Sequence, residues 1–168
     1  MKHGKSWGIV VALILTPICA LGFLSANRQS KIEFDYLGAE RLAREYMKVI
    51  DDGDLRSQME LVSRDPNVSS TIMGETWHGW DAIKTRSEIY VPYSKKIRNV
   101  LGKIDVIALG SSAAVVVVPF RSERRQASDQ SIPEFEQSLT LVLKQTPQGW
   151  RMIHEHVSAK ISPTPSPK

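Results

Sequence analysis

The stretch Gln148-Gly149-Trp150-Arg151-Met152-Ile153-His154-Glu155-His156-Val157-Ser158 decides the fold of this chain. It follows an alternating apolar run at 135–145 across the breaker Thr146-Pro147-Gln148-Gly149, which predicts two neighbouring strands joined by a tight turn. Side chains alternate between the two faces of a strand. One face is therefore expected to carry Trp150, Met152, His154 and His156, and the other Arg151, Ile153, Glu155 and Val157.

Four strand-forming runs are predicted in the last third of the chain. They lie at 101–108, 113–123, 135–145 and 150–157, and are separated by turn residues and by a polar loop at 124–133. The segment Val115 to Val118 is apolar without alternation, which favours a central strand covered on both faces. The run that starts at Phe135 alternates regularly, so one of its faces is expected to be wet or to meet a partner.

Two helices are predicted in the first half of the chain. Apolar residues recur at helical spacing between Ala39 and Ile50, and Asp51-Asp52-Gly53 ends this helix. Asp54 then caps a shorter helix, which stops before Pro66. The buried stripe of the shorter helix is expected to be Leu55, Met59 and Val62.

A short strand and a third helix are predicted next. The strand occupies 68–73, and a turn at Gly74-Glu75 follows it. Gly79 can adopt a backbone conformation that is closed to other residues just before the helix begins. Pro92 is expected to break or kink this helix.

Length and charge indicate a single domain with no nucleic-acid partner. The chain has 168 residues, 42% of them apolar, and about 130 remain for a core once both ends are set aside. The net charge of +4 falls to +1 when Lys2, Lys5 and Lys168 in the flanking segments are left out. A groove for a phosphate backbone needs a concentrated basic surplus, which this domain lacks.

Residues 1–26 are predicted to direct export. A basic start is followed by an apolar stretch and by small residues. Cleavage by signal peptidase and an uncleaved inner-membrane anchor both fit, because Trp7 to Leu24 is about long enough to cross a bilayer. Lipid attachment at Cys19 is disfavoured, since Ile18 stands where a small residue is needed. The domain is expected to be periplasmic, secreted or anchored, with membrane contact only through this segment.

The remainder of the chain is expected to divide into three parts. A linker occupies 27–33, and the folded domain occupies 34–160. A Pro-rich tail follows at 161–168 and is expected to be disordered. Cys19 is the single cysteine, so no intrachain disulfide can form. A folded part without cysteine suits an oxidising compartment.

Three local motifs agree with this order of elements: Asp65-Pro66-Asn67-Val68, Trp77-His78-Gly79-Trp80-Asp81-Ala82-Ile83 and the stretch from Gly149 to Ser158. In these motifs the chain resembles the SnoaL-like branch of the nuclear-transport-factor-2-like superfamily, over about residues 34–160. The resemblance implies an α+β fold, in which three helices cover a cone-shaped, curved antiparallel sheet of four long strands plus a short one. It also implies an apolar pocket on the concave face and a homodimer formed through the outer sheet face.

The resemblance also bears on the chemistry of the pocket. Isomerases and cyclases of this superfamily abstract a proton with an aspartate near the end of the first strand. Here that strand reads Val68-Ser69-Ser70-Thr71-Ile72-Met73, which offers no acid and counts against proton abstraction by that route. Because the superfamily combines many activities with domains of no known reaction, the fold alone names no function.

His154 and His156 are the candidates for catalysis. Two residues apart on a strand they point the same way, so they could act as general acid and base, or bind a metal together with His78 or Glu75. The competing interpretation is structural, with His156 packed inside the cone and His154 near the rim. No strong third ligand accompanies them, so neither a metal nor a cofactor is expected.

Aromatic residues are expected to line the pocket with flat apolar walls and hydroxyl tips. The expected ligand-binding residues are Tyr46, Trp77, Trp80, Tyr90, Trp150 and His156. The alternative is that these residues belong to the core. At least one tyrosine hydroxyl, that of Tyr46 or Tyr90, is expected to reach the pocket.

Three functions are compatible with these patterns. The favoured one is an exported binding or interaction module for a small apolar or amphipathic molecule, without established catalysis. The second is an enzyme of the isomerase, dehydratase or cyclase type with His154 or His156 as its base, which two imidazoles on the outer sheet face would exclude. The third is an envelope assembly component of a secretion system, since a basic start, one membrane segment and an exported domain also have that layout.

Overall fold

The structure is a computed structural model that describes residues 34–126 and 134–160. The predicted export segment, linker and tail lie outside these residues. Within them there are three helices, α1 (Tyr36–Asp52), α2 (Leu55–Leu61) and α3 (Trp80–Ser94). The strands of the same part are β1 (Ser69–Ile72), β2 (Glu75–His78), β3 (Ile97–Leu101), β4 (Asp105–Ala108), β5 (Ala113–Arg124), β6 (Phe135–Thr146) and β7 (Gly149–Ala159). No helix of the described part is long and apolar enough to cross a membrane.

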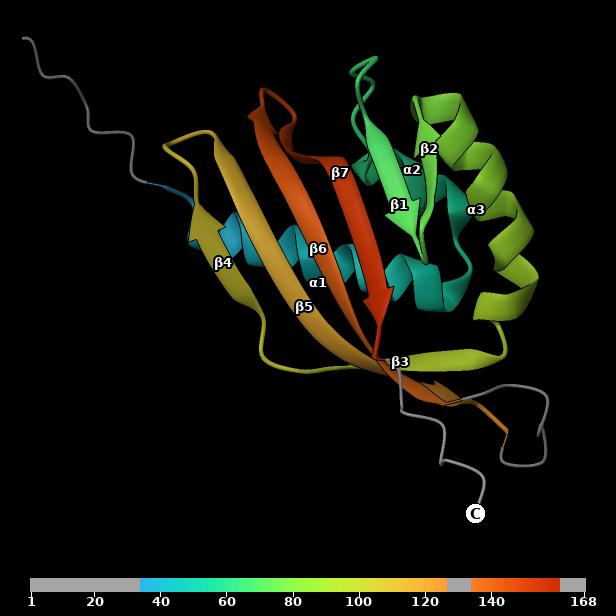
Figure 1. Cartoon of the computed structure of the whole chain (residues 1–168). Coiled ribbons are helices and arrows are strands. Elements are labelled where there is room, and N and C mark those ends of the chain that lie inside the picture. Colours follow the sequence, from blue (N-terminus) through green and yellow to red (C-terminus); the bar gives the residue numbers. More distant parts are fainter. Residues whose placement is uncertain (1–33, 127–133, 161–168) are drawn as a thin grey trace, which may run out of the picture. The chain divides into compact units, whose positions relative to one another are not determined.

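The strands form one curved, mixed sheet. Their order is β2-β1-β7-β6-β5-β3, and β4 also pairs with β5 (Figure 1). The predicted α+β architecture with three helices is confirmed, whereas the predicted strand count and purely antiparallel pairing are wrong. Seven strands are present in the described residues, and β1 pairs in parallel with β7.

Two local features explain the extra strands. Met73 and Gly74 both have positive φ, 51° and 88°, and make a tight turn that lets residues 75–78 pair back onto β1 as β2. The run predicted as a single strand at 101–108 is interrupted at Gly102, whose N–H donates to the carbonyl oxygen of Pro119 at 2.7 Å. As a result β3 and β4 pair with different halves of β5.

The predicted helix ends are confirmed because each depends on a local contact. Gly53 caps the C-terminus of α1 with φ of 64°, and the Asp54 side chain accepts from the Ser57 N–H at the start of α2. Gly79 precedes α3 with φ of 83°. Pro92 lies in the last turn of α3, so the helix ends two residues after it instead of breaking there.

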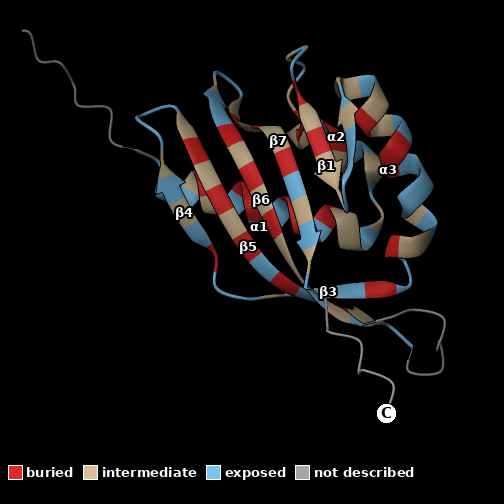
Figure 2. Cartoon of the chain, viewed as in Figure 1, coloured by how far each residue is buried: buried red, intermediate tan, exposed pale blue. Residues whose placement is uncertain are grey.

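The core lies between α1 and the inner face of the sheet. One face of α1, which includes Ala43 and Met47, packs with inward residues of β5, β6 and β7 such as Val116, Leu141 and Met152. Figure 2 shows buried positions recurring along these strands. The expected central place of β5 is confirmed, since it lies between β6 and β3, while Val115 and Val117 on its outer face are half-buried.

A β-bulge in β7 determines which side chains face inward. Val142 of β6 pairs with His154, but the next residue, Leu143, pairs with Met152, so Ile153 is an extra residue without a direct partner. The alternation predicted from Trp150 to His156 is therefore wrong beyond Met152. Trp150, Met152 and Glu155 are all buried, whereas His156 is exposed.

Candidate functional site

A cavity of about 290 Å³ lies between α1, α3 and the inner face of the sheet. This volume is at the small end of ligand pockets, which span about 300–1,000 Å³. Most of its wall is apolar, with Ile50, Phe120, Leu139 and Val157 among the lining residues. The shape and lining suit a small molecule with an apolar body.

A buried carboxyl group forms part of the cavity wall. Glu155 is 4% exposed, and its Oε2 accepts a hydrogen bond from Tyr46 Oη while its Oε1 accepts one from Ser70 Oγ at 3.2 Å. Ser70 is the parallel-strand partner of Glu155, so the pairing of β1 with β7 fixes this contact. Burial raises the pKa of Glu155, and burial followed by the charge of Glu155 raises the pKa of Tyr46 well above its ordinary value. The pair can hold and exchange a proton in a site shielded from water.

The Tyr46 hydroxyl is held from a second side. Gln58 Nε2 of α2 donates to Tyr46 Oη at 3.4 Å and to Ser87 Oγ of α3 at 3.3 Å. Tyr46 itself is fully buried on α1. Three helices and β7 thus orient one phenol towards one carboxyl group.

Arg86 of α3 places a cation in the same wall. Its side chain lines the cavity, and the residue is 7% exposed. The guanidinium carbon lies 3.1 Å from the centroid of the Tyr90 ring and 4.9 Å from that of Trp77. Burial lowers the pKa of Arg86, although a guanidinium stays protonated in proteins.

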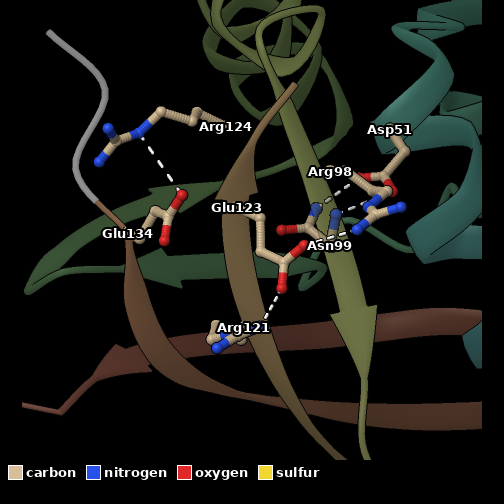
Figure 3. Close-up of polar contacts among 7 residues, drawn as sticks. All are labelled: Asp51, Arg98, Asn99, Arg121, Glu123, Arg124 and Glu134. Atoms are coloured by element: carbon tan, nitrogen blue, oxygen red, sulfur yellow. Dashed lines mark hydrogen bonds and ion pairs between the residues drawn. The ribbon is translucent and has the colours of Figure 1, made fainter. Parts of the chain in front are cut away.

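A chain of amide and hydroxyl groups makes another part of the wall. Gln137 Nε2 donates to Ser122 Oγ at 2.7 Å, Ser122 Oγ donates to Asn99 Oδ1 at 2.7 Å, and Asn99 Nδ2 donates to Asp51 Oδ1 at 2.5 Å. Figure 3 shows Asp51 and Asn99 in contact, with ion pairs of neighbouring residues around them. Burial raises the pKa of Asp51, and the hydrogen bonds from Asn99 lower it in part. Because these groups bond one another, the chain serves to brace β3, β5 and β6.

The structure brings two of the expected aromatic residues into the cavity wall. Its lining residues include Tyr46 and Tyr90, the two tyrosines named for this place, and a hydroxyl that reaches the pocket stays a prediction. The three tryptophans Trp77, Trp80 and Trp150 are not among its lining residues, which corrects their expected place.

Each tryptophan is fixed elsewhere by a specific contact. Trp150 is buried beneath the start of α1, where its Nε1 donates to Asp35 Oδ2 at 3.2 Å. Trp80 lies in a separate surface hollow between α2 and the β6–β7 turn, and its Nε1 donates to the carbonyl oxygen of Met59 at 3.2 Å. Trp77 is partly buried and packs against Arg86, a lining residue of the cavity.

The two candidate histidines lie on the outer face of the sheet, contrary to expectation. The bulge at Ile153 turns His154 and His156 outward and Glu155 inward. His154 Nδ1 is hydrogen-bonded to Ser69 Oγ at 2.8 Å. Burial lowers the pKa of His154, and the charge of His156 lowers it further. Among the described residues, no three histidine, cysteine or acidic side chains cluster closely enough to hold a metal ion.

Glu155, Arg86 and Ser70 were missed by the sequence reasoning. One signal was present: Trp150, Met152 and Val157 are apolar, but strict alternation cannot put all three on one face, because the positions of Met152 and Val157 differ by five, an odd number. A bulge between them restores a common face and carries Glu155 with it. Arg86 had no comparable signal, since a lone arginine on a helix is usually solvated.

The comparisons with known proteins agree on the family and the fold. A family model described as SnoaL-like domain matches residues 39–162. No curated protein matches the chain.

Several solved structures share the fold. A proposed dehydratase of the nuclear-transport-factor-2-like family from Streptomyces avermitilis is 15% identical, with a TM-score of 0.66 over 75% of this chain and 96% of that chain. An uncharacterised protein with a cystatin-like fold from Caulobacter vibrioides is 20% identical, with a TM-score of 0.64 over 75% and 89%. A proposed scytalone dehydratase from Novosphingobium aromaticivorans is 12% identical, with a TM-score of 0.62 over 74% and 83%. At these identities the likeness establishes the fold expected from the sequence and nothing about the reaction.

Proposed function

The chain belongs to the SnoaL-like domain family, and from that premise we propose that it binds a small, largely apolar molecule inside the cavity. The observation that carries the proposal is the cavity of about 290 Å³, whose apolar wall is interrupted by the buried group of Glu155, Tyr46 and Ser70. Apolar walls supply affinity, and a few fixed polar groups supply orientation. The polar end of the ligand is expected to lie at Glu155.

Ligand-dependent thermal unfolding of the full-length chain tests this proposal. A panel of small ring compounds that carry one polar group should include members that raise the melting temperature, because a ligand at 100 times its Kd adds about 2.7 kcal/mol to stability. Val157→Phe should abolish the rise, since Val157 lines the cavity and the larger ring fills it. Val142→Phe is the matched control on the outer face of β6. The proposal fails if no compound raises the melting temperature, or if Val157→Phe responds as the wild type does.

Proton transfer to or from the bound molecule is a second candidate function. The buried Glu155 favours it, because burial raises the pKa of its carboxyl group, and such a group can take and give a proton, with Tyr46 positioned beside it. This replaces the histidine-based hypothesis, which the outward direction of His154 and His156 excludes. The names of two structural neighbours, both proposed dehydratases, are compatible with such chemistry.

Hydrogen–deuterium exchange of a bound ketone tests the second candidate. In heavy water, the wild type should accelerate exchange of the protons next to the carbonyl, as followed by proton NMR. Glu155→Gln should remove the acceleration, and His156→Gln should leave it unchanged because that ring is exposed on the outer face. Equal exchange rates for the wild type and Glu155→Gln would refute the proton-transfer function and leave only the binding function.

Export and homodimer formation remain predictions of the sequence. Mass spectrometry of the mature N-terminus distinguishes a cleaved signal from an anchor. A pull-down from a detergent extract that recovers no envelope partner would argue against a role in envelope assembly.

A further inference from the structure

We propose that the ligand of this cavity carries a carboxylate, and that Arg86 binds it through the N–H edge of its guanidinium group. The inference rests on the proposed function, since it names the chemical class of the molecule that occupies the same cavity. It adds a binding residue on α3 to the group formed by Glu155, Tyr46 and Ser70.

Arg86 is a buried cation without an anion in contact. It is 7% exposed and lines the cavity. Its Nε has no hydrogen-bond partner, and none of the ion pairs formed within residues 34–126 and 134–160 includes it. Removing a charge from water is costly unless a paired charge and hydrogen bonds compensate. An anion that enters the cavity would supply both.

The aromatic neighbours of Arg86 do not take up every N–H donor of its guanidinium group. The rings of Tyr90 and Trp77 lie 3.1 Å and 4.9 Å from the guanidinium carbon and contact the cation as π-systems, and the Tyr90 side chain also forms a hydrogen bond with Arg86, but Nε stays without an acceptor. The plane of a guanidinium presents parallel donors that match the two oxygens of a carboxylate. A planar, bidentate acceptor is therefore the best match for the unused edge.

Glu155 does not take this place, and it does not oppose a ligand carboxylate. Both of its oxygens already accept hydrogen bonds, one from Tyr46 and one from Ser70. Burial raises its pKa, which shifts it towards the neutral acid and reduces its repulsion of a second carboxylate. The neutral form of Glu155 also has a proton to donate to that carboxylate.

The rest of the wall limits what the carboxylate can be attached to. Phe120, Leu139 and Val157 offer no hydrogen bonds from their side chains, and the cavity measures about 290 Å³. The expected ligand is therefore a small carboxylic acid with an apolar ring or a short apolar chain.

Matched acids and amides test the inference with isothermal titration calorimetry on the full-length chain at pH 7. The pairs are phenylacetate and phenylacetamide, cyclohexanecarboxylate and cyclohexanecarboxamide, and hexanoate and hexanamide. Because a hydrogen bond to a charged group is worth more than a neutral one, the wild type should bind at least one acid about tenfold or more tightly than its amide.

Variants of Arg86 assign the preference to this residue. Arg86→Met keeps an apolar stem and should reduce the ratio of acid to amide affinity to about one, whereas Arg86→Lys should restore part of it because the ammonium keeps the charge without the planar fork. Arg44→Met is the control, since Arg44 pairs with Glu40 on the exposed side of α1. Circular dichroism establishes that each variant is folded, and if Arg86→Met is not, the ratios measured for the wild type and Arg86→Lys decide.

The possible results separate this inference from the function on which it rests. Acids preferred by the wild type, with the preference lost or reduced in the Arg86 variants only, support it. Amides that bind as well as acids overturn it and leave the binding function standing. If neither acids nor amides bind, the inference is overturned. If, in addition, no neutral ring compound raises the melting temperature, the binding function is overturned as well. An acid preference that survives in the Arg86 variants assigns the site to another residue and overturns the inference too.

Discussion

Replacing Glu155 by glutamine should remove one pH-dependent component of stability. Burial raises the pKa of Glu155 in the folded chain above its ordinary value of 4.5, so the folded state keeps this proton in a pH range where the unfolded state has released it. The free energy of unfolding of the wild type should therefore fall as the pH rises from near 4.5 to the raised pKa. A difference of one bound proton corresponds to a slope of about 1.4 kcal/mol per pH unit.

Glutamine lacks this proton equilibrium and preserves the local contacts. Its side-chain oxygen can accept from Tyr46 Oη, and its amide can donate to Ser70 Oγ, so at pH 4 the substitution should change stability by no more than about 1 kcal/mol. As the pH increases, Glu155→Gln should become progressively more stable relative to the wild type. Asp51, whose pKa burial also raises, titrates equally in both proteins and cancels in the difference.

Urea unfolding followed by tryptophan fluorescence between pH 4 and pH 8 measures this difference. Glu136→Gln is a control of opposite sign: Lys160 lowers the pKa of the exposed Glu136, so its contribution is present above its ordinary pKa and is lost as the pH falls. Parallel stability curves for the wild type and Glu155→Gln across this range would refute the conclusion that burial raises the pKa of Glu155.

Three further substitutions probe the fold around the cavity, each by urea unfolding at pH 7. Tyr46→Phe leaves Oε2 of Glu155 without its donor and should cost about 1–3 kcal/mol; no loss would mean that this hydrogen bond is replaced. Asp54→Ala removes the cap of α2 and should cost about 1 kcal/mol, whereas the neighbouring exposed Arg56→Ala should be nearly neutral. Gly79→Ala should cost about 1–3 kcal/mol through backbone strain alone, because a Cβ there meets no atom within 4 Å; a neutral result would contradict the positive φ of 83° at this position.

The parts of the fold that depend on near neighbours in the chain were predictable. Asp54 accepts from Ser57, three residues away, and Gly53 and Gly79 adopt conformations that glycine alone adopts easily. Apolar periodicity placed α1 and the three long strands β5, β6 and β7 for the same reason.

The parts that depend on pairing between distant segments were not predictable from local patterns. The interruption at Gly102 is visible only against Pro119 of β5, and the bulge at Ile153 only against β6. Since the direction of Glu155 follows from that bulge, the absence of an acid from β1 did not reveal that an acid from β7 lines the cavity. Tyr46 and Tyr90 each lie on a helix, where the position of a side chain needs no strand register, and both are among the lining residues of the cavity.

The extra residue in β7 shifts the alternation of inward and outward side chains by one position. Loss of the single codon for Ile153 would place Met152 next to His154 and turn β7 into a regular strand, with Glu155 still inside and His154 and His156 still outside. The bulge can thus be lost in one genetic step that leaves the direction of every other side chain of β7 unchanged. A sequence alignment without a gap opposite Ile153 would align Glu155 with an outward-facing residue of a related strand.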